Sequence, residues 1–180
     1  PESVTSIGSS AFENNKLTSV TIPNGVTSIG YSAFNDNELP DSQAFIYKRN
    51  TDGSEDKTII VSYGGKNKNV IIPNAVTAIG DSAFSNNNLT SVTIPNSVVS
   101  IGERAFSDNN LTTIEIPNSV TTINGAAFSG NNLKQVTIQG KSSSSDFTTY
   151  YPNWGWASDV TCVKNNTSNV TNGCITWKIN

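Results

Sequence analysis

Apolar residues recur along the chain at a fixed interval of 22 positions. This interval separates Phe12 from Phe34, and it separates Phe84, Phe106 and Phe128 from one another. Between phenylalanines the same slots hold Leu, Val, Ile, Pro, Val, Ile, Gly and Ala, with polar residues between them. A period this constant predicts that each unit folds in the same way and buries its apolar side chains against its neighbours.

Each unit predicts a short strand followed by a bend. In the copy "LTSVTIPN" at 17–24, Val20 and Ile22 are two residues apart and face one side of a strand. Pro23 cannot donate a hydrogen bond to a sheet, so it ends the strand. Segments such as "YSAF" and "DSAF" predict single helical turns that carry the Phe inward. A period of 20 to 29 residues with these slots indicates a β-rich leucine-rich repeat solenoid, right-handed, with 22-residue coils and a parallel concave sheet.

Two polar slots repeat with the same period. An asparagine three residues after each Phe predicts a structural ladder that satisfies backbone groups of adjacent coils, with a ligand role as the alternative. Its members are Asn15, Asn37, Asn87, Asn109 and Asn131. The glycine slot at Gly8, Gly30, Gly80 and Gly102 predicts a positive φ at a corner, and Asn124 fills the same slot in a later copy.

The units "LTSVTIPNGVTSIGYSAF" and "LTSVTIPNSVVSIGERAF" resemble the leucine-rich repeats of the BspA-like, Treponema-type family. The pattern of that family is close to L-x-x-I-x-I-P-x-x-V-x-x-I-G-x-x-A-F-x-x-C. Here Asn replaces the frequent Cys in every copy, and the unit is one residue shorter. The resemblance implies a secreted or surface-attached bacterial protein, commonly one that adheres to host proteins or to other cells.

A long insertion interrupts the repeat. Phe34 and Phe84 are 50 residues apart, which exceeds the period by 28. Leu39 fills its slot, but the Val slot that should follow is reached only at Val70, so the extra residues lie at about 40–67. Within them an alternating segment, the turn "NTDGSEDK" and the returning run "TIIVSY" predict a β-hairpin that projects beside the concave sheet.

The hairpin turn also invites a calcium interpretation, because "NTDGSED" offers several oxygen donors near a glycine. Lys48 occupies the position that the first Asp of a standard calcium loop would hold. We therefore expect a plain polar turn and no metal or other cofactor.

The pattern ends after Ile138, so the sequence predicts a solenoid over 1–138 and a capping segment over 139–180. An open solenoid end exposes the core, and five aromatic residues are candidates to cover it, with an exposed sugar-binding platform as the alternative. These are Phe147, Tyr150, Tyr151, Trp154 and Trp156. Cys162 and Cys174 lie in two strand-like pieces and predict a disulfide that closes the cap. A redox or metal pair is the alternative.

Composition removes several classes of function. The chain has no His, which excludes Ser/His/Asp and Cys/His catalysis within it, and its carboxylates are scattered, so we expect no enzyme. The net charge is -3 with no Lys/Arg cluster, which argues against nucleic acid as a partner. No apolar run approaches the roughly 20 residues that span a bilayer. With no Met and no leader segment, the chain is expected to belong to a longer protein.

The remaining hypothesis is an extracellular or cell-surface binding module that recognises a host or neighbouring-cell protein or glycan. Outward residues of the concave strands would form two columns, and Tyr47 and Arg49 of the hairpin would supply stronger anchors. The columns are Ser19 and Thr21, Asn69 and Ile71, Ser91 and Thr93, Thr113 and Glu115, and Gln135 and Thr137. Two alternatives stay open: the columns are merely strand-forming residues that tolerate water, or the repeats are a structural spacer with no ligand.

Overall fold

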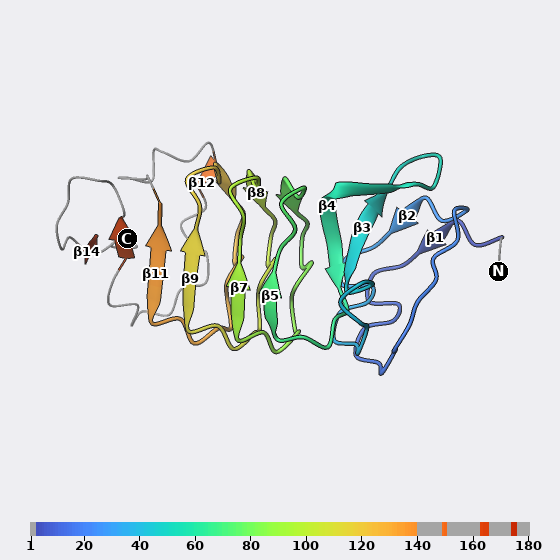
Figure 1. The fold of residues 1–180 in the computed structure, drawn as a ribbon, viewed down its shortest axis with the longest axis horizontal. Coiled ribbons are helices and arrows are strands. Elements are labelled where there is room, and N and C mark those ends of the chain that lie inside the picture. Colours follow the sequence, from blue (N-terminus) through green and yellow to red (C-terminus); the bar gives the residue numbers. More distant parts are fainter. Residues whose placement is uncertain (1–2, 140–148, 151–162, 166–173, 176–180) are drawn as a thin grey trace.

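The computed structural model describes residues 3–139 and, beyond them, the strands at 149–150, 163–165 and 174–175. The strands stack side by side along the long axis of the molecule, with one face formed by β5, β7, β9 and β11 (Figure 1). This front face comprises β5 (Asn69–Ile71), β7 (Ser91–Thr93), β9 (Thr113–Ile116), β11 (Gln135–Ile138), β13 (Val163–Asn165) and β14 (Cys174–Ile175). It is divided into a β5-β7 sheet and a β14-β13-β11-β9 sheet.

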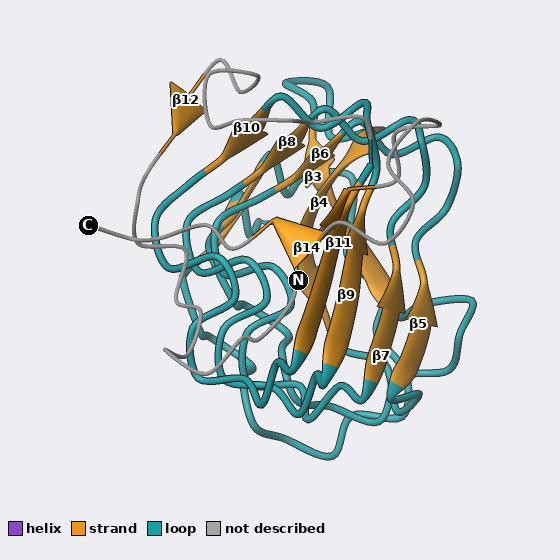
Figure 2. Cartoon of the chain, turned by 90° about the vertical axis from the view of Figure 1, so that its left-hand side faces the viewer, coloured by secondary structure: helices purple, strands orange, loops and turns teal. Residues whose placement is uncertain are grey.

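A second row of strands forms the back of the solenoid (Figure 2). It contains β1 (Ser6–Ile7), β2 (Ser28–Ile29), β3 (Phe45–Arg49), β4 (Glu55–Tyr63), β6 (Ala78–Ile79), β8 (Ser100–Ile101), β10 (Thr122–Ile123) and β12 (Thr149–Tyr150). β1 and β2 pair with each other, and the others form a six-stranded sheet in the order β12-β10-β8-β6-β4-β3.

Both rows keep the register that the repeat predicts. Ser100 pairs in parallel with Thr122, and Val70 pairs in parallel with Val92, each with its counterpart in the next coil. Identical spacing therefore brings equivalent residues into line, and a solenoid results. One predicted strand does not form: segment 19–22 has the same residues as 91–94 but is not a strand.

The Phe corners differ from the predicted helical turns. No helix occurs in the described part of the chain, and hence none there could cross a bilayer. Residues with φ near +54° stand two positions after each glycine slot and two after each Phe, as at Ser82 and Asn86. At these corners successive backbone N–H groups donate alternately to their own coil and to the next coil. Ala83 N donates to Gly80 O, whereas Phe84 N donates to Ala105 O.

The glycine slot serves a different purpose from the predicted one. Among the described glycines, positive φ values occur at Gly53 and Gly130, not in the repeated slot. At Gly102 an added Cβ would lie 2.5 Å from Asp81 Oδ1 and 2.6 Å from Asp81 N, so glycine is needed because two coils approach closely. Gly8 has nothing within 4 Å of that position. The prediction of positive φ was wrong, since the strained residue comes two positions later.

The core consists of two clusters that meet at the insertion. The larger one begins in the irregular coil with Ala44, Ile60 and Tyr63 and runs to Ile138, and the smaller one surrounds Phe34 and Leu39. Ring stacking follows the same division. Phe84, Phe106 and Phe128 stack at centroid distances of 5.1 and 5.4 Å, and Phe12 stacks on Phe34 at 5.2 Å.

The insertion is an irregular extra coil and not a projection, which corrects the predicted placement. β3 and β4 pair antiparallel, and Ile60 of β4 pairs in parallel with Ile79 of β6. Tyr63 stacks on Phe84 at 5.2 Å and so takes the place of a Phe. The buried Leu39 fills the Leu slot of this coil. The extra residues therefore join the back sheet and the core.

Beyond Ile138 the described backbone continues both rows. β12 pairs in parallel with β10, β13 pairs in parallel with β11, and β14 pairs antiparallel with β13. Cys162 and four of the five predicted capping aromatics lie outside the described residues, as do the side chains of Tyr150 and Cys174. The disulfide and the aromatic lid stay predictions.

Candidate functional site

The asparagine slot lies inside the solenoid and joins coils. Asn109 donates from Nδ2 to Phe84 O at 2.8 Å and to Phe106 O at 3.0 Å, and its Oδ1 accepts from Leu89 N at 2.9 Å. Asn37 and Asn131 make the equivalent three contacts. Asn87 instead accepts from Asp36 N, and Asn15 is exposed and bonds to Glu13 O. The amides of Asn37, Asn109 and Asn131 are thus occupied by backbone groups of two coils, whereas Asn15 joins no coils.

The front face carries the two predicted columns. The residues from Ser19 to Glu115 are exposed, whereas Gln135 and Thr137 are half-buried. Several of these side chains bond to each other: Ser91 Oγ donates to Asn69 Oδ1 at 2.8 Å, and Gln139 donates to Glu115. Ile71 is the one large apolar member and is 75% exposed. The columns form a small, polar surface without the aromatic or Arg anchors of tight interfaces.

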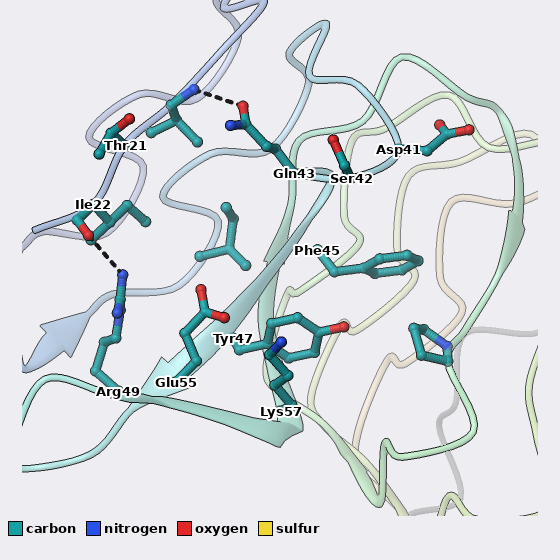
Figure 3. Close-up of a pocket in the computed structure, with 13 residues that line it drawn as sticks. Thr21, Ile22, Asp41, Ser42, Gln43, Phe45, Tyr47, Arg49, Glu55 and Lys57 are labelled. Carbon is teal, nitrogen blue, oxygen red and sulfur yellow. Dashed lines mark hydrogen bonds between the residues drawn. The ribbon is translucent and has the colours of Figure 1, made fainter. Parts of the chain in front are cut away.

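A cleft of about 580 Å³ opens where the front face is interrupted (Figure 3). One wall is the strandless segment 20–22, and Pro73 of the next regular coil lies opposite. The floor comes from β3, whose Phe45, Tyr47 and Arg49 face the cleft at alternate positions. Asp41, Ser42, Gln43, Ile46, Glu55 and Lys57 complete the lining. Aromatic, charged and amide groups therefore converge here and nowhere on the regular front strands.

Two side chains in the cleft bind the backbone of its wall (Figure 3). Gln43 Oε1 accepts from Val20 N at 3.0 Å, and Arg49 Nη2 donates to Ile22 O at 3.2 Å. Arg49 Nη1 also donates to Gly53 O at 2.8 Å, while its Nε is buried without a hydrogen-bond partner. Arg49 is 8% exposed, so it lies inside the protein and is not the free anchor on a projecting hairpin that was predicted.

Tyr47 is the aromatic residue of the cleft with a polar end. It is half-buried and packs against the larger core cluster. Partial burial, together with the nearby Glu55 carboxylate, raises the pKa of the Tyr47 hydroxyl above its usual value. The hydroxyl is therefore neutral at physiological pH and can donate or accept a hydrogen bond.

The hairpin turn uses its oxygen donors internally. Asp52 Oδ1 accepts from Ser54 N and Oγ at 2.9 and 2.6 Å, and Asp56 Oδ1 accepts from Thr58 N and Oγ1 at 3.1 and 2.6 Å. These bonds lower the pKa of both carboxyl groups. Across the described residues no three His, Cys, Asp or Glu side chains gather as metal ligands would.

The cleft was not predicted from the sequence. The alternation of Phe45, Tyr47 and Arg49 signals one shared face, but the contribution of segment 20–22 depends on the strand that fails to form there. Gln43 and Lys57 carry no local signal, since one lies in a turn and the other on the exposed part of β4.

Comparisons with solved structures show the same fold. A leucine rich cell surface protein from Faecalibacterium prausnitzii matches with a TM-score of 0.60 and 22% identity over 94% of this chain. A leucine-rich repeat protein from Bacteroides ovatus matches with a TM-score of 0.51 and 30% identity over 78%. The pneumococcal vaccine antigen PcpA matches with a TM-score of 0.50 and 21% identity over 75%.

This chain spans 53%, 36% and 42% of the length of those three proteins. No curated protein matches it. The family described as BspA type leucine rich repeat region matches in six copies over residues 1–46 and 62–153. The match omits most of β3 and β4 and extends past the predicted boundary at 138. The resemblance stated from the repeat units is confirmed: the chain belongs to the BspA-type leucine-rich repeat family.

Proposed function

We propose that this chain is an extracellular or cell-surface binding module, and that its contact surface is the cleft at the irregular coil together with the adjacent front face. The observation that carries the proposal is the convergence of Phe45, Tyr47 and Lys57 at the single interruption of the described repeats. Ligand sites are commonly concave and bring a few polar groups together. Insertions in repeat proteins often alter the binding surface while the core persists.

The location is inferred from the relatives. The Faecalibacterium protein is described as a cell surface protein, and the pneumococcal protein is described as a vaccine antigen. The partner is accordingly a host or neighbouring-cell protein or glycan. Neither nucleic acid nor an anionic membrane is favoured, because the chain has 11 Lys and Arg residues against 14 Asp and Glu.

Deletion of the insertion is a poor test, because Ile60 and Tyr63 belong to the core. The sharper test is Tyr47→Ala, with Tyr31→Ala as the matched control. Tyr31 is 57% exposed and does not line the cleft. Wild-type protein and both variants would be applied to arrays of glycans and extracellular matrix proteins. We expect Tyr47→Ala to weaken binding about tenfold or more, as for a buried aromatic anchor.

A second pair avoids any effect on folding. Lys57 and Lys66 are both exposed, but only Lys57 lines the cleft. Lys57→Ala should lower the association rate or the affinity, and Lys66→Ala should not. Equal binding by all four variants would remove the cleft from the contact surface. Failure of the wild-type protein to bind any array or intact cells would favour the structural spacer.

A further inference from the structure

The front face lacks one strand at the level of the irregular coil. Regular coils pair their front strands with those of adjacent coils, as β5 does with β7 and β9 does with β11. In the irregular coil the chain turns at this level, where Gln43 N donates to Pro40 O at 2.8 Å, and then enters β3. Segment 20–22 therefore faces the cleft with no strand beside it.

The backbone groups of that segment point into the vacant level. In β5, Ile72 donates its N–H to Thr93 O at 3.1 Å, so Val70 and Ile72 direct their N–H and C=O groups toward the coil that follows. Val20 and Ile22 occupy the same slots in their own coil. Gln43 Oε1, which accepts from Val20 N, and Arg49 Nη2, which donates to Ile22 O, thus occupy the positions that the C=O and N–H groups of a neighbouring strand would occupy.

These substitutes can be displaced. Gln43 makes a single described hydrogen bond through its side chain, to Val20 N. The Arg49 guanidinium is bonded to two neutral carbonyl oxygens, and its buried Nε has no partner. A group that is not fully satisfied loses less when it moves than a saturated one does.

The floor fits the side chains of a strand. Phe45 and Tyr47 are two residues apart on β3 and face the cleft together. A strand laid against segment 20–22 would direct every second side chain at these rings and the others at solvent.

We propose that the cleft binds an extended peptide segment of a partner protein, which adds as a strand along segment 20–22 and places alternate apolar side chains on Phe45 and Tyr47. The inference rests on the proposed binding function and specifies the partner. Main-chain hydrogen bonds would supply affinity and the two rings would supply selectivity. A glycan does not offer alternating N–H and C=O groups at strand spacing, so the observations favour a peptide.

The repeat itself supplies a probe. A synthetic peptide "LTSVTIP", residues 89–95, has the sequence of a front strand and alternates apolar and polar side chains. Two derivatives would carry N-methyl groups on alternate amides, so that each derivative blocks one edge of the peptide. Binding to the whole chain would be followed by fluorescence anisotropy, and the amide signals of Val20, Thr21 and Ile22 by NMR.

We expect one derivative to bind about tenfold or more weakly and the other to bind within about threefold of the parent. We also expect the three amide signals to shift. Gln43→Ala should bind the parent peptide about fivefold more tightly, because the Val20 N–H no longer has to lose a partner. Gln139→Ala, a glutamine outside both the cleft and the two columns, is the matched control.

Absence of binding, equal effects of the two derivatives, or weaker binding by Gln43→Ala would each overturn strand addition. So would a dimer in sedimentation that Gln43→Ala strengthens, since the occupant would then be a second copy of the chain. The array experiment distinguishes failure of strand addition from failure of the proposed function. If the peptide does not bind but Tyr47→Ala still loses binding to the array, the cleft is a binding site for another kind of ligand, and only strand addition is overturned.

Discussion

The chain contains the same eight letters, "LTSVTIPN", at 17–24 and at 89–96, and they fold differently. At 89–96 they form β7, with Leu89 and Ile94 buried. At 17–24 they form no strand, and the equivalent Leu17 and Ile22 are only partly buried. The second copy has the preceding coil beside it as a strand partner, β5. The first copy faces the cleft.

This difference shows that strand formation depends on the neighbouring coils and not on the sequence of the repeat unit alone. Preference for the β conformation depends strongly on what packs beside and across a segment. In a solenoid the stability is approximately the sum of what each coil contributes by itself and what its interfaces with the neighbouring coils contribute. The coils before the insertion are therefore expected to be less stable locally than those between Val70 and Ile138, and matched substitutions in the two regions can test this.

The largest contrast is expected in the phenylalanine stack. Phe106 is fully buried and stacked on both sides, so Phe106→Ala should lower the free energy of unfolding by about 3–5 kcal/mol. Phe12 is 42% exposed with one ring partner, and Phe12→Ala should cost about 1 kcal/mol. Urea unfolding followed by circular dichroism would measure both, and equal losses would contradict the division into two regions.

The asparagine slot should show the next contrast. Asn109→Ala leaves Leu89 N and the Phe84 and Phe106 carbonyls without their partner, and we expect a loss of about 2–4 kcal/mol. Asn15 is exposed with one local bond, so Asn15→Ala should change stability by no more than about 0.5 kcal/mol. The same urea titration applies. A large effect at Asn15 would mean that this coil is ordered by contacts other than those described.

The glycine slot separates close approach from backbone conformation. At Gly102 a Cβ would overlap Asp81, and Gly102→Ala should destabilise by about 1–3 kcal/mol. At Gly8 the space is open, so Gly8→Ala should be neutral or stabilise by about 0.5 kcal/mol. Thermal unfolding of both variants is the measurement. Equal destabilisation by Gly102→Ala and Gly8→Ala would indicate that backbone conformation, and not the distance between coils, selects glycine at this position.

The smallest effect concerns Tyr63 and pH. Burial, with a contribution from Asp41, raises the pKa of Tyr63 to about 12 from the ordinary 10.0. The folded state therefore keeps a proton that the unfolded state releases, and stability is complete below pH 10 and falls as pH rises toward 12. Tyr63→Phe loses the bond to Asn67 O, about 1 kcal/mol near neutrality.

The check is the free energy of unfolding of both proteins between pH 8 and pH 12. The alkaline decline should be shallower in Tyr63→Phe than in the wild type, and not abolished, because the pKa of Tyr47 is also raised. Parallel curves would show that Tyr63 ionises as easily in the folded state as in the unfolded one.

Much of the fold could be predicted because the same spacing of apolar residues recurs in every repeat unit. Two-residue spacing places Val70 and Ile72 inward, and the Phe interval places Phe84 and Phe106 in one stack. The glycine prediction failed because proximity between coils and positive φ both select glycine, and one sequence does not distinguish them. Ser and Arg at the strained positions gave no signal of their own.

The site could be predicted only in fragments. The alternation in β3 identifies a shared face for Tyr47 and Arg49, yet not whether that face is exposed. Arg49 was expected to be a free anchor because the hairpin was predicted to project, whereas it lies inside the protein and donates to Ile22 O and Gly53 O. The cleft depends on two segments, 20–22 and β3, that are separated by residues 23–44, and no local pattern connects them.

The irregular coil restores the alignment of everything that follows it: Ile60 is in line with Ile79, and Tyr63 is in line with Phe84. An exchange of this stretch between related genes would leave the flanking coils in phase whatever its length at the tip. The family match stops at residue 46 and resumes at residue 62, so the departure from the repeat pattern is confined to the hairpin. The solenoid thus accommodates a stretch of different sequence while the coils that follow it stay aligned.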